Sequence, residues 1–172
     1  IHLGATSCYV GDNTDIIQMR EGLWQIRRLL VNTLAALADF MEKWKGQPTL
    51  AYTHFQAAQP TTVGKRATLW AQDLLMDLEA LEHQLKNLKL LGCKGTTGTG
   101  ASFLELFHGD AGKVKKLEEL IAKRMDFDGV YPVSGQTYSR KVDFNVLSVL
   151  SGIAQSAAKF SNDIRLLSHL KE

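Results

Sequence analysis

Apolar residues recur at every seventh position through the early part of the chain. One row comprises Ile16, Leu23, Leu30, Leu37 and Trp44, and a second comprises Met19, Ile26, Thr33 and Phe40. A seven-residue period keeps one face of a helix toward its neighbours, so the rows predict a long helix packed in a bundle. We expect this helix to begin near Asn13 or Thr14, either of which can be the N-cap, and to end at Gly46 and Pro48.

Further helices are expected later in the chain. Thr61 or Thr62 can cap a second long helix, whose buried face is marked by Leu74, Leu78, Leu81, Leu85 and Leu88. A short helix is expected over residues 111–125. The last helix begins within residues 136–141 and carries these apolar residues on or near its buried face: Val142, Leu147, Leu150, Ile153, Ala157, Phe160, Ile164 and Leu167.

The segments between these helices are irregular. Residues 48–62 are polar, and residues 92–100 contain four glycines. Because each glycine costs about 1 kcal/mol relative to alanine inside a helix, this run predicts a tight loop or a broken helix. The only short β-like run, residues 129–133, contains Pro132, which argues against a strand. We therefore predict an all-α fold, a long-helix bundle forming a single domain over residues 1–172.

Composition excludes several classes of function. The net charge of +2 argues against nucleic acid or a membrane surface as the main partner. The two cysteines, Cys8 and Cys93, are too few for a disulfide framework and lack the spacing of a metal site, which favours reduced thiols in the cytoplasm. No apolar run approaches the roughly 20 residues needed to span a bilayer. Three apolar residues off the main rows, Trp24, Leu29 and Leu34, indicate either packing against other subunits or a larger internal core.

Three short segments hold residues that suit chemistry. His54 lies in a polar loop beside Thr53, where a histidine can act as a general acid or base or can make a structural hydrogen bond. Thr6 and Ser7 precede the first long helix and could bind an anion or simply form caps. Gln136 stands where the last helix begins, and its amide could donate to a ligand carboxylate or cap the helix.

Five motifs follow one another along the chain: IHLGATSCYVGDNTD, YTHFQAAQPTTVGKR, KGTTGTGASF, SGQTYSRKVD and SNDIRLLSHLKE. In this order and spacing they resemble the adenylosuccinate lyase family of the fumarase/aspartase superfamily, and the animal-type enzymes more than the shorter bacterial ones. The resemblance implies elimination of fumarate from adenylosuccinate, giving AMP, and from the succinylated aminoimidazole carboxamide ribotide (SAICAR), giving AICAR. This general acid/base β-elimination belongs to purine nucleotide biosynthesis, and the resemblance implies neither an organic cofactor nor a metal.

The resemblance also assigns roles to single residues. His54 matches the family's catalytic histidine, the general acid that protonates the leaving nitrogen. Thr6 and Ser7 match a pair that contacts a substrate carboxylate, Gln136 matches a glutamine that contacts substrate, and Thr53 is a further contact.

The family's architecture implies a central helical domain that assembles into a multi-subunit core. A homotetramer with active sites shared between copies is expected, and Thr6, His54 and Gln136 of one copy would face different active sites. The chain opens on Ile1 and ends on Lys171-Glu172 without a helix stop signal. We therefore expect a fragment that lacks the N-terminal domain and the signature loop with the serine general base, and that is inactive by itself.

Two other interpretations stay open. One is a different lyase of the superfamily, such as argininosuccinate lyase, although the segments GQTYSRK and TSCYVGDN argue against it. The other is a catalytically silent helical module used for assembly, which the seven-residue rows would support equally well. Thr6, His54 and Gln136 separate the two classes, because a scaffold has no reason to hold them in loops.

Overall fold

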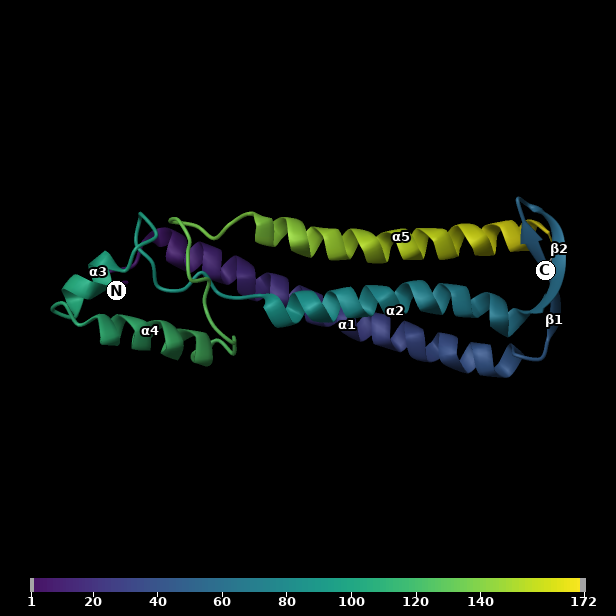
Figure 1. Ribbon diagram of the computed structural model, residues 1–172, viewed down its shortest axis with the longest axis horizontal. Coiled ribbons are helices and arrows are strands. Elements are labelled where there is room, and N and C mark those ends of the chain that lie inside the picture. The colour runs from purple at the N-terminus through teal and green to yellow at the C-terminus, as the bar shows by residue number, and fades with distance from the viewer. Residues whose placement is uncertain (1, 171–172) are drawn as a thin grey trace. The chain divides into compact units, whose positions relative to one another are not determined.

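The computed structural model describes residues 2–170 and is mostly helical (Figure 1). Its elements are, in chain order, α1 (Ser7–Trp44), β1 (Pro48–Thr53), β2 (Gln56–Thr62), α2 (Val63–Asn87), α3 (Ala101–Leu106), α4 (Ala111–Arg124) and α5 (Lys141–His169). The prediction of a long-helix fold is confirmed. Ile1 and Lys171-Glu172, on which the expectation of a fragment rests, lie outside the described residues.

The chain divides into two compact units, each built from segments far apart in sequence. Within the described residues, the first unit comprises residues 2–24 and 84–146, and the second comprises residues 25–83 and 147–170. Helices α1, α2 and α5 each contribute to both units. The single domain expected from the sequence stays a prediction.

Helix α1 begins at Ser7, so its predicted start near Asn13 or Thr14 is wrong. Asn13 does not cap the helix. Its amide donates to the Tyr9 carbonyl one turn earlier (2.8 Å) and its side-chain oxygen accepts from the Gly92 backbone N–H (3.3 Å). A polar side chain that favours an N-cap position when it is exposed can lie inside a helix when another segment of the chain supplies its hydrogen-bond partners.

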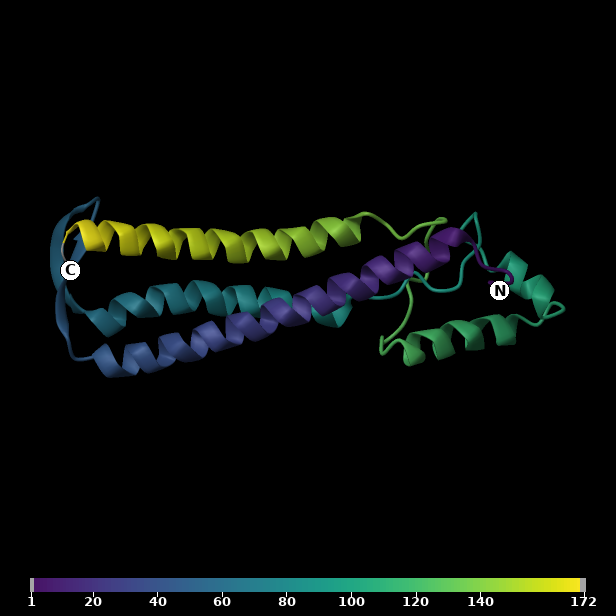
Figure 2. The same cartoon turned by 180° about the vertical axis from the view of Figure 1, so that it is seen from behind.

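In the second unit, α1, α2 and α5 run side by side in both views (Figures 1 and 2). Trp70 of α2 is buried and meets Phe160 of α5 edge to face, with ring centroids 4.9 Å apart. Its indole N–H also donates to Asp163 on α5 (2.8 Å). Helix α2 begins as predicted, because Thr62 accepts the Lys65 backbone N–H (3.1 Å) and so caps it.

Residues 48–62 form an antiparallel hairpin, so the prediction of an irregular segment is wrong. Pro48 pairs with Thr62 at its open end, and Thr53 pairs with Gln56 beside the turn. Two prolines and the polar character of β2 make the sequence of this hairpin unlike that of an ordinary strand pair. The structure tolerates both prolines, because a proline at the first residue of a strand or at a sheet edge loses no required hydrogen bond. It lies across the ends of the three long helices of the second unit (Figure 1).

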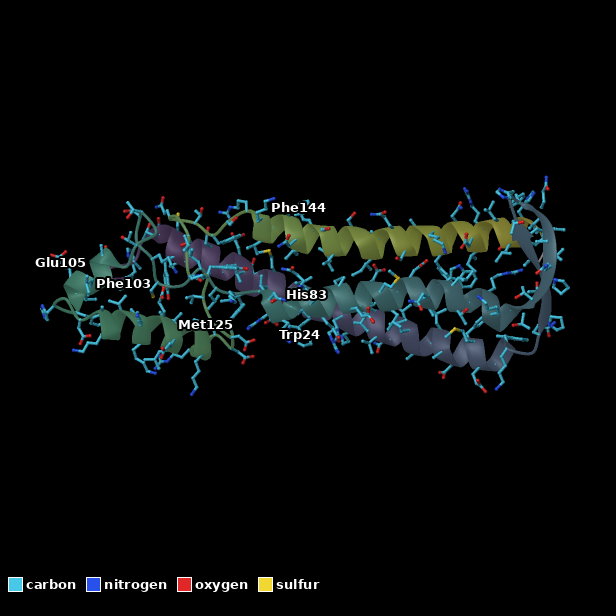
Figure 3. All side chains as sticks on the ribbon, in the orientation of Figure 1. Trp24, His83, Phe103, Glu105, Met125 and Phe144 are labelled. Atoms are coloured by element: carbon cyan, nitrogen blue, oxygen red, sulfur yellow. The ribbon has the colours of Figure 1, made fainter. Side chains whose placement is uncertain are left out.

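The core of the first unit joins α1 to the segment that follows α2 and to the segment between α4 and α5. Ile16, Leu90, Leu91 and Tyr138 belong to this buried cluster, and Leu90 forms an isolated parallel bridge with Val130. Residues 92–100 form a loop, one of the two predicted alternatives, and α3 follows it with Phe103 buried (Figure 3). Helix α4 begins near its predicted position, capped by Asp110, which accepts the Lys113 backbone N–H (3.1 Å).

Lys94 is buried in this unit, and its ammonium group has three partners. It donates to the Leu91 carbonyl (3.0 Å), the Tyr131 carbonyl (2.9 Å) and the Glu118 carboxylate (3.1 Å). We expect Lys94→Ala to lower the free energy of unfolding by about 2–4 kcal/mol. The two carbonyls and the Glu118 carboxylate would lose the ammonium group that donates hydrogen bonds to them. Denaturant unfolding measures this. The control Lys116→Ala removes an exposed ion pair with Glu119 and should cost at most about 0.5 kcal/mol. An equal loss of unfolding free energy in the two variants would contradict the stabilising role of the three Lys94 hydrogen bonds.

Candidate active site

Thr6 and Gln136 are brought together in the first unit from positions 130 residues apart. The Gln136 amide donates to the Thr6 hydroxyl at 3.0 Å, and Gln136 is exposed. Thr6 immediately precedes α1, and Ser7 is the first residue of that helix. The first N–H groups of a helix lack partners within the helix and favour a negative group. The two hydroxyls, the amide and the helix start therefore form a set of donors suited to a carboxylate.

Asp12 connects α1 to the segment that carries Gln136. Its buried carboxylate accepts the Tyr138 backbone N–H (2.8 Å) and a guanidinium N–H of Arg140 (3.2 Å). Burial alone would lower the pKa of Arg140, but the hydrogen bond and the charge of Asp12 outweigh it and raise that pKa. Asp12 is thus a buried charge with two partners, both within four residues of Gln136.

Tyr138 anchors the same segment from its other side. Its side chain is buried, its hydroxyl donates to Asp143 on α5 (2.6 Å), and the Arg140 guanidinium lies 4.2 Å from its ring centroid. Burial, followed by the hydrogen bond to Asp143, raises the pKa of Tyr138 to about 12. The phenol therefore stays protonated and keeps donating throughout the neutral range.

Gly98 allows two loops to approach closely just before Gln136. It has a φ of +75°, and a Cβ placed there would lie 2.1 Å from the Ser134 carbonyl oxygen and 2.8 Å from the Gly135 Cα. Only glycine combines this conformation with this contact at little cost. The glycine-rich loop thus has a definite role in the first unit, which is to support the segment leading to Gln136.

His54 occupies the turn of the β1–β2 hairpin in the second unit. His54 and Phe55 join the strands and have φ values of +52° and +57°, the backbone of a two-residue type I′ turn. Asparagine and glycine adopt this turn cheaply, whereas a bulky residue such as Phe55 is strained in it. The turn leaves His54 exposed, and Thr53, the last residue of β1, is exposed beside it.

An open cavity of about 230 Å³ lies beside this turn within the second unit. Tyr52 and Phe55 of the hairpin, Trp70 of α2 and Leu166 of α5 are among its lining residues. The cavity is mostly apolar, and Arg66 and Asp163 add charge to its wall. His54 thus lies two residues after Tyr52 and directly before Phe55, and both of these aromatic residues line a hollow of the size of a small ligand group.

The predicted site residues fall into two groups. Thr6, Ser7 and Gln136 belong to the first unit, where the structure joins Thr6 to Gln136, so the expectation that these two residues of one copy face different active sites is wrong. Thr53 and His54 belong to the second unit. Sequence reasoning missed Asp12 as a connection between segments. A signal was available, because Asp12 lies four residues before the buried Ile16 and hence on the buried face of α1.

Two kinds of feature are absent from the described part of the chain. Among residues 2–170, no group of three or more histidine, cysteine, aspartate or glutamate side chains could hold a metal ion. None of the described helices combines the length and the apolar character needed to cross a membrane. Cys8 and Cys93 are both free thiols, and burial raises the pKa of Cys93 to about 11.

Comparison with known proteins extends over nearly the whole chain. Residues 1–170 match a protein-family model described as lyase (Lyase_1). Adenylosuccinate lyase from Saccharomyces cerevisiae is 55% identical over 172 residues, which are 100% of this chain and 36% of that protein. Adenylosuccinate lyase from the fluke Schistosoma mansoni is 48% identical over 174 residues, with 100% and 36% coverage. The chain thus spans about a third of the length of these curated relatives.

Solved structures agree with the fold. A fumarate lyase from Mesorhizobium sp. BNC1 superimposes with a TM-score of 0.84 and 24% identity, covering 97% of this chain and 37% of that chain. At this identity the likeness concerns the fold, and it confirms the predicted long-helix architecture. The sequence motifs, the family match over residues 1–170 and this shared fold agree, and the chain belongs to the lyase family.

Proposed function

We propose that the chain is the central helical part of an adenylosuccinate lyase. The complete protein would release fumarate from adenylosuccinate to give AMP, and from SAICAR to give AICAR, in purine nucleotide biosynthesis. The observation that carries this proposal is the Thr6–Gln136 hydrogen bond at the start of α1, which gathers donors for a carboxylate from two distant motifs. The names of the relatives from yeast and fluke support the choice of substrate.

The chemistry divides between residues of this chain and a base outside it. A base removes the proton from the carbon next to a substrate carboxylate, and the electron pair left behind forms the double bond of fumarate as the carbon–nitrogen bond breaks. His54 donates a proton to the leaving nitrogen as general acid. Thr6, Ser7 and Gln136 bind a carboxylate and favour the negative charge that develops on it, and Thr53 adds a contact beside His54. No cofactor takes part.

We place the general base, a serine on the family's signature loop, outside residues 1–172. The isolated chain would then hold the acid and several substrate contacts but no base, and we expect it to be inactive. The full-length protein is therefore the proper subject for every activity measurement.

We further propose a cytoplasmic homotetramer whose active sites are shared between copies. Large apolar side chains support this assembly, because exposed rows along long helices are typical of surfaces that other subunits cover. In the first unit, Trp24 is 49% and Phe144 is 63% exposed (Figure 3), and in the second, Leu29 is 57% exposed. Leu34, by contrast, is half-buried. Small-molecule substrates and further copies of the same chain would be its partners, with no role for nucleic acid or membrane.

A substrate panel tests the proposal. The full-length protein should release fumarate from adenylosuccinate and from SAICAR at a steady rate, with little release from argininosuccinate. Preferential turnover of argininosuccinate would favour the other superfamily lyase. A stable assembly with no turnover of any of the three substrates would instead indicate the silent helical module. Steady turnover by the isolated 172-residue chain would contradict the placement of the base.

A further inference from the structure

Asp12 connects α1, which directly follows Thr6, to the segment that carries Gln136. It lies on α1, six residues after Thr6, which immediately precedes that helix, and its carboxylate accepts a hydrogen bond from the backbone N–H of Tyr138, two residues after Gln136. The residue is 6% exposed. A buried carboxylate is costly unless hydrogen bonds and a counter-charge satisfy it. Both are present, as the Tyr138 N–H and the Arg140 guanidinium.

The position of the Gln136 amide depends on the contacts that hold the backbone of its segment. Without Asp12, the segment before α5 would keep the Tyr138–Asp143 hydrogen bond, which is within its own stretch of chain, but would lose its polar links to α1 at residues 138 and 140. The Gln136 side chain itself is exposed, so neighbouring side chains do not hold it in place by packing. Its position 3.0 Å from Thr6 then depends on the backbone to which it is attached.

We propose that Asp12 is a positioning residue for substrate binding: its carboxylate fixes the 138–140 backbone to α1 and so holds the Gln136 amide against Thr6 for capture of a substrate carboxylate. This proposal rests on the function proposed above for Thr6 and Gln136. Asp12 does not touch the substrate in this arrangement. It acts through Gln136, and its effect should disappear when Gln136 is gone.

Two substitutions separate the parts of this role. Asp12→Asn keeps a side-chain oxygen that can accept the Tyr138 N–H but removes the charge opposite Arg140. Asp12→Ala removes both. We expect the KM for adenylosuccinate of the full-length protein to rise roughly tenfold in Asp12→Ala and roughly threefold in Asp12→Asn, with kcat changed less than twofold. Asp15→Ala, an exposed aspartate of the same helix, is the matched control and should leave both constants unchanged.

A double-mutant cycle distinguishes positioning from general stabilisation. In the Gln136→Ala background, Asp12→Ala should raise KM less than twofold, because the residue through which it acts is missing. The same tenfold rise in both backgrounds would overturn the proposal, as would a loss confined to kcat. If Asp12→Ala fails to fold, the cycle is run with Asp12→Asn, and its threefold effect should likewise vanish.

Amide hydrogen exchange of the full-length protein tests the same idea without substrate. Exchange at residues 136–140 should be at least tenfold faster in Asp12→Ala than in wild type, while exchange in the second unit is unchanged. Unchanged exchange at residues 136–140 would overturn the positioning role even if the enzyme is active. Conversely, if the wild type turns over no adenylosuccinate but exchange accelerates as expected, the proposed function fails and the link from Asp12 to Gln136 stands.

Discussion

Replacing Gly98 with alanine should lower the free energy of unfolding by roughly 2–5 kcal/mol, because strain and overlap act together. The backbone at this position has a φ of +75°, and the new Cβ would lie 2.1 Å from the Ser134 carbonyl oxygen. Neither atom of the clash belongs to a flexible side chain, so the backbone itself must move. The displaced residues directly precede Gln136, and we expect the KM for substrate to rise as well.

Gly135 supplies the control for this experiment. It lies in the opposing loop, has no positive φ, and a Cβ there would meet its nearest neighbour at 4.0 Å. Gly135→Ala should therefore change stability by about 0.5 kcal/mol or less. Denaturant unfolding of the full-length protein compares the two variants. A Gly98→Ala protein as stable as wild type would show that the two loops do not approach each other as described.

His54→Ala should lower kcat of the full-length enzyme by about 10²- to 10⁴-fold, the range typical for loss of a general acid. The thermal unfolding midpoint should stay near that of wild type, because His54 is exposed at a turn and alanine removes no buried group. Adenylosuccinate turnover and thermal unfolding, measured on the same preparation, provide both readouts.

His169, an exposed histidine at the end of α5, serves as the matched control. His169→Ala should retain near-normal turnover. Near-normal turnover in His54→Ala would rule out the acid role, whereas an equal loss in both variants would point to a disturbance of the second unit rather than to chemistry.

The helices could be predicted from the sequence because their periodicity is local. Ile16, Leu23 and Leu30 are buried as their spacing predicts, and the cap at Thr62 is confirmed by its bond to Lys65. The expected buried face of the last helix is wrong in part, because Leu147, Phe160 and Ile164 are exposed. The start of α1 could not be predicted from local preference. The side chain of Asn13 suits a cap, but Gly92, distant in sequence, satisfies it inside the helix.

The hairpin could not be predicted for a different reason. Its turn residues are His54 and Phe55 rather than asparagine and glycine, so the usual sequence signal of a two-residue turn is absent. A turn built from unfavourable residues is more typical of sites where a side chain is held for function than of sites selected for stability alone. The same residue choice that hides the strands thus agrees with the proposed role of His54.

Part of the candidate site could be predicted from its motifs, and part depends on contacts that no local pattern reveals. Thr6, His54 and Gln136 are recognisable as polar residues in loops beside long helices. The roles of Asp12 and Gly98 depend on their approach to Tyr138 and Ser134, which lie far along the chain. Such partners become known only when the fold brings the segments together.

The proposed fumarate-releasing site, shared between copies of the chain, is tested most directly by mixing two inactivated variants of the full-length protein. His54→Ala and Gln136→Ala are combined in equal amounts under conditions that allow subunits to exchange, and fumarate release from adenylosuccinate is followed at low substrate. If each site takes these two residues from different copies, about a quarter of the sites regain both, and activity should rise to about a quarter of the wild-type rate. Activity that stays at the level of the separate variants, although mass measurements show mixed assemblies, would contradict the shared site.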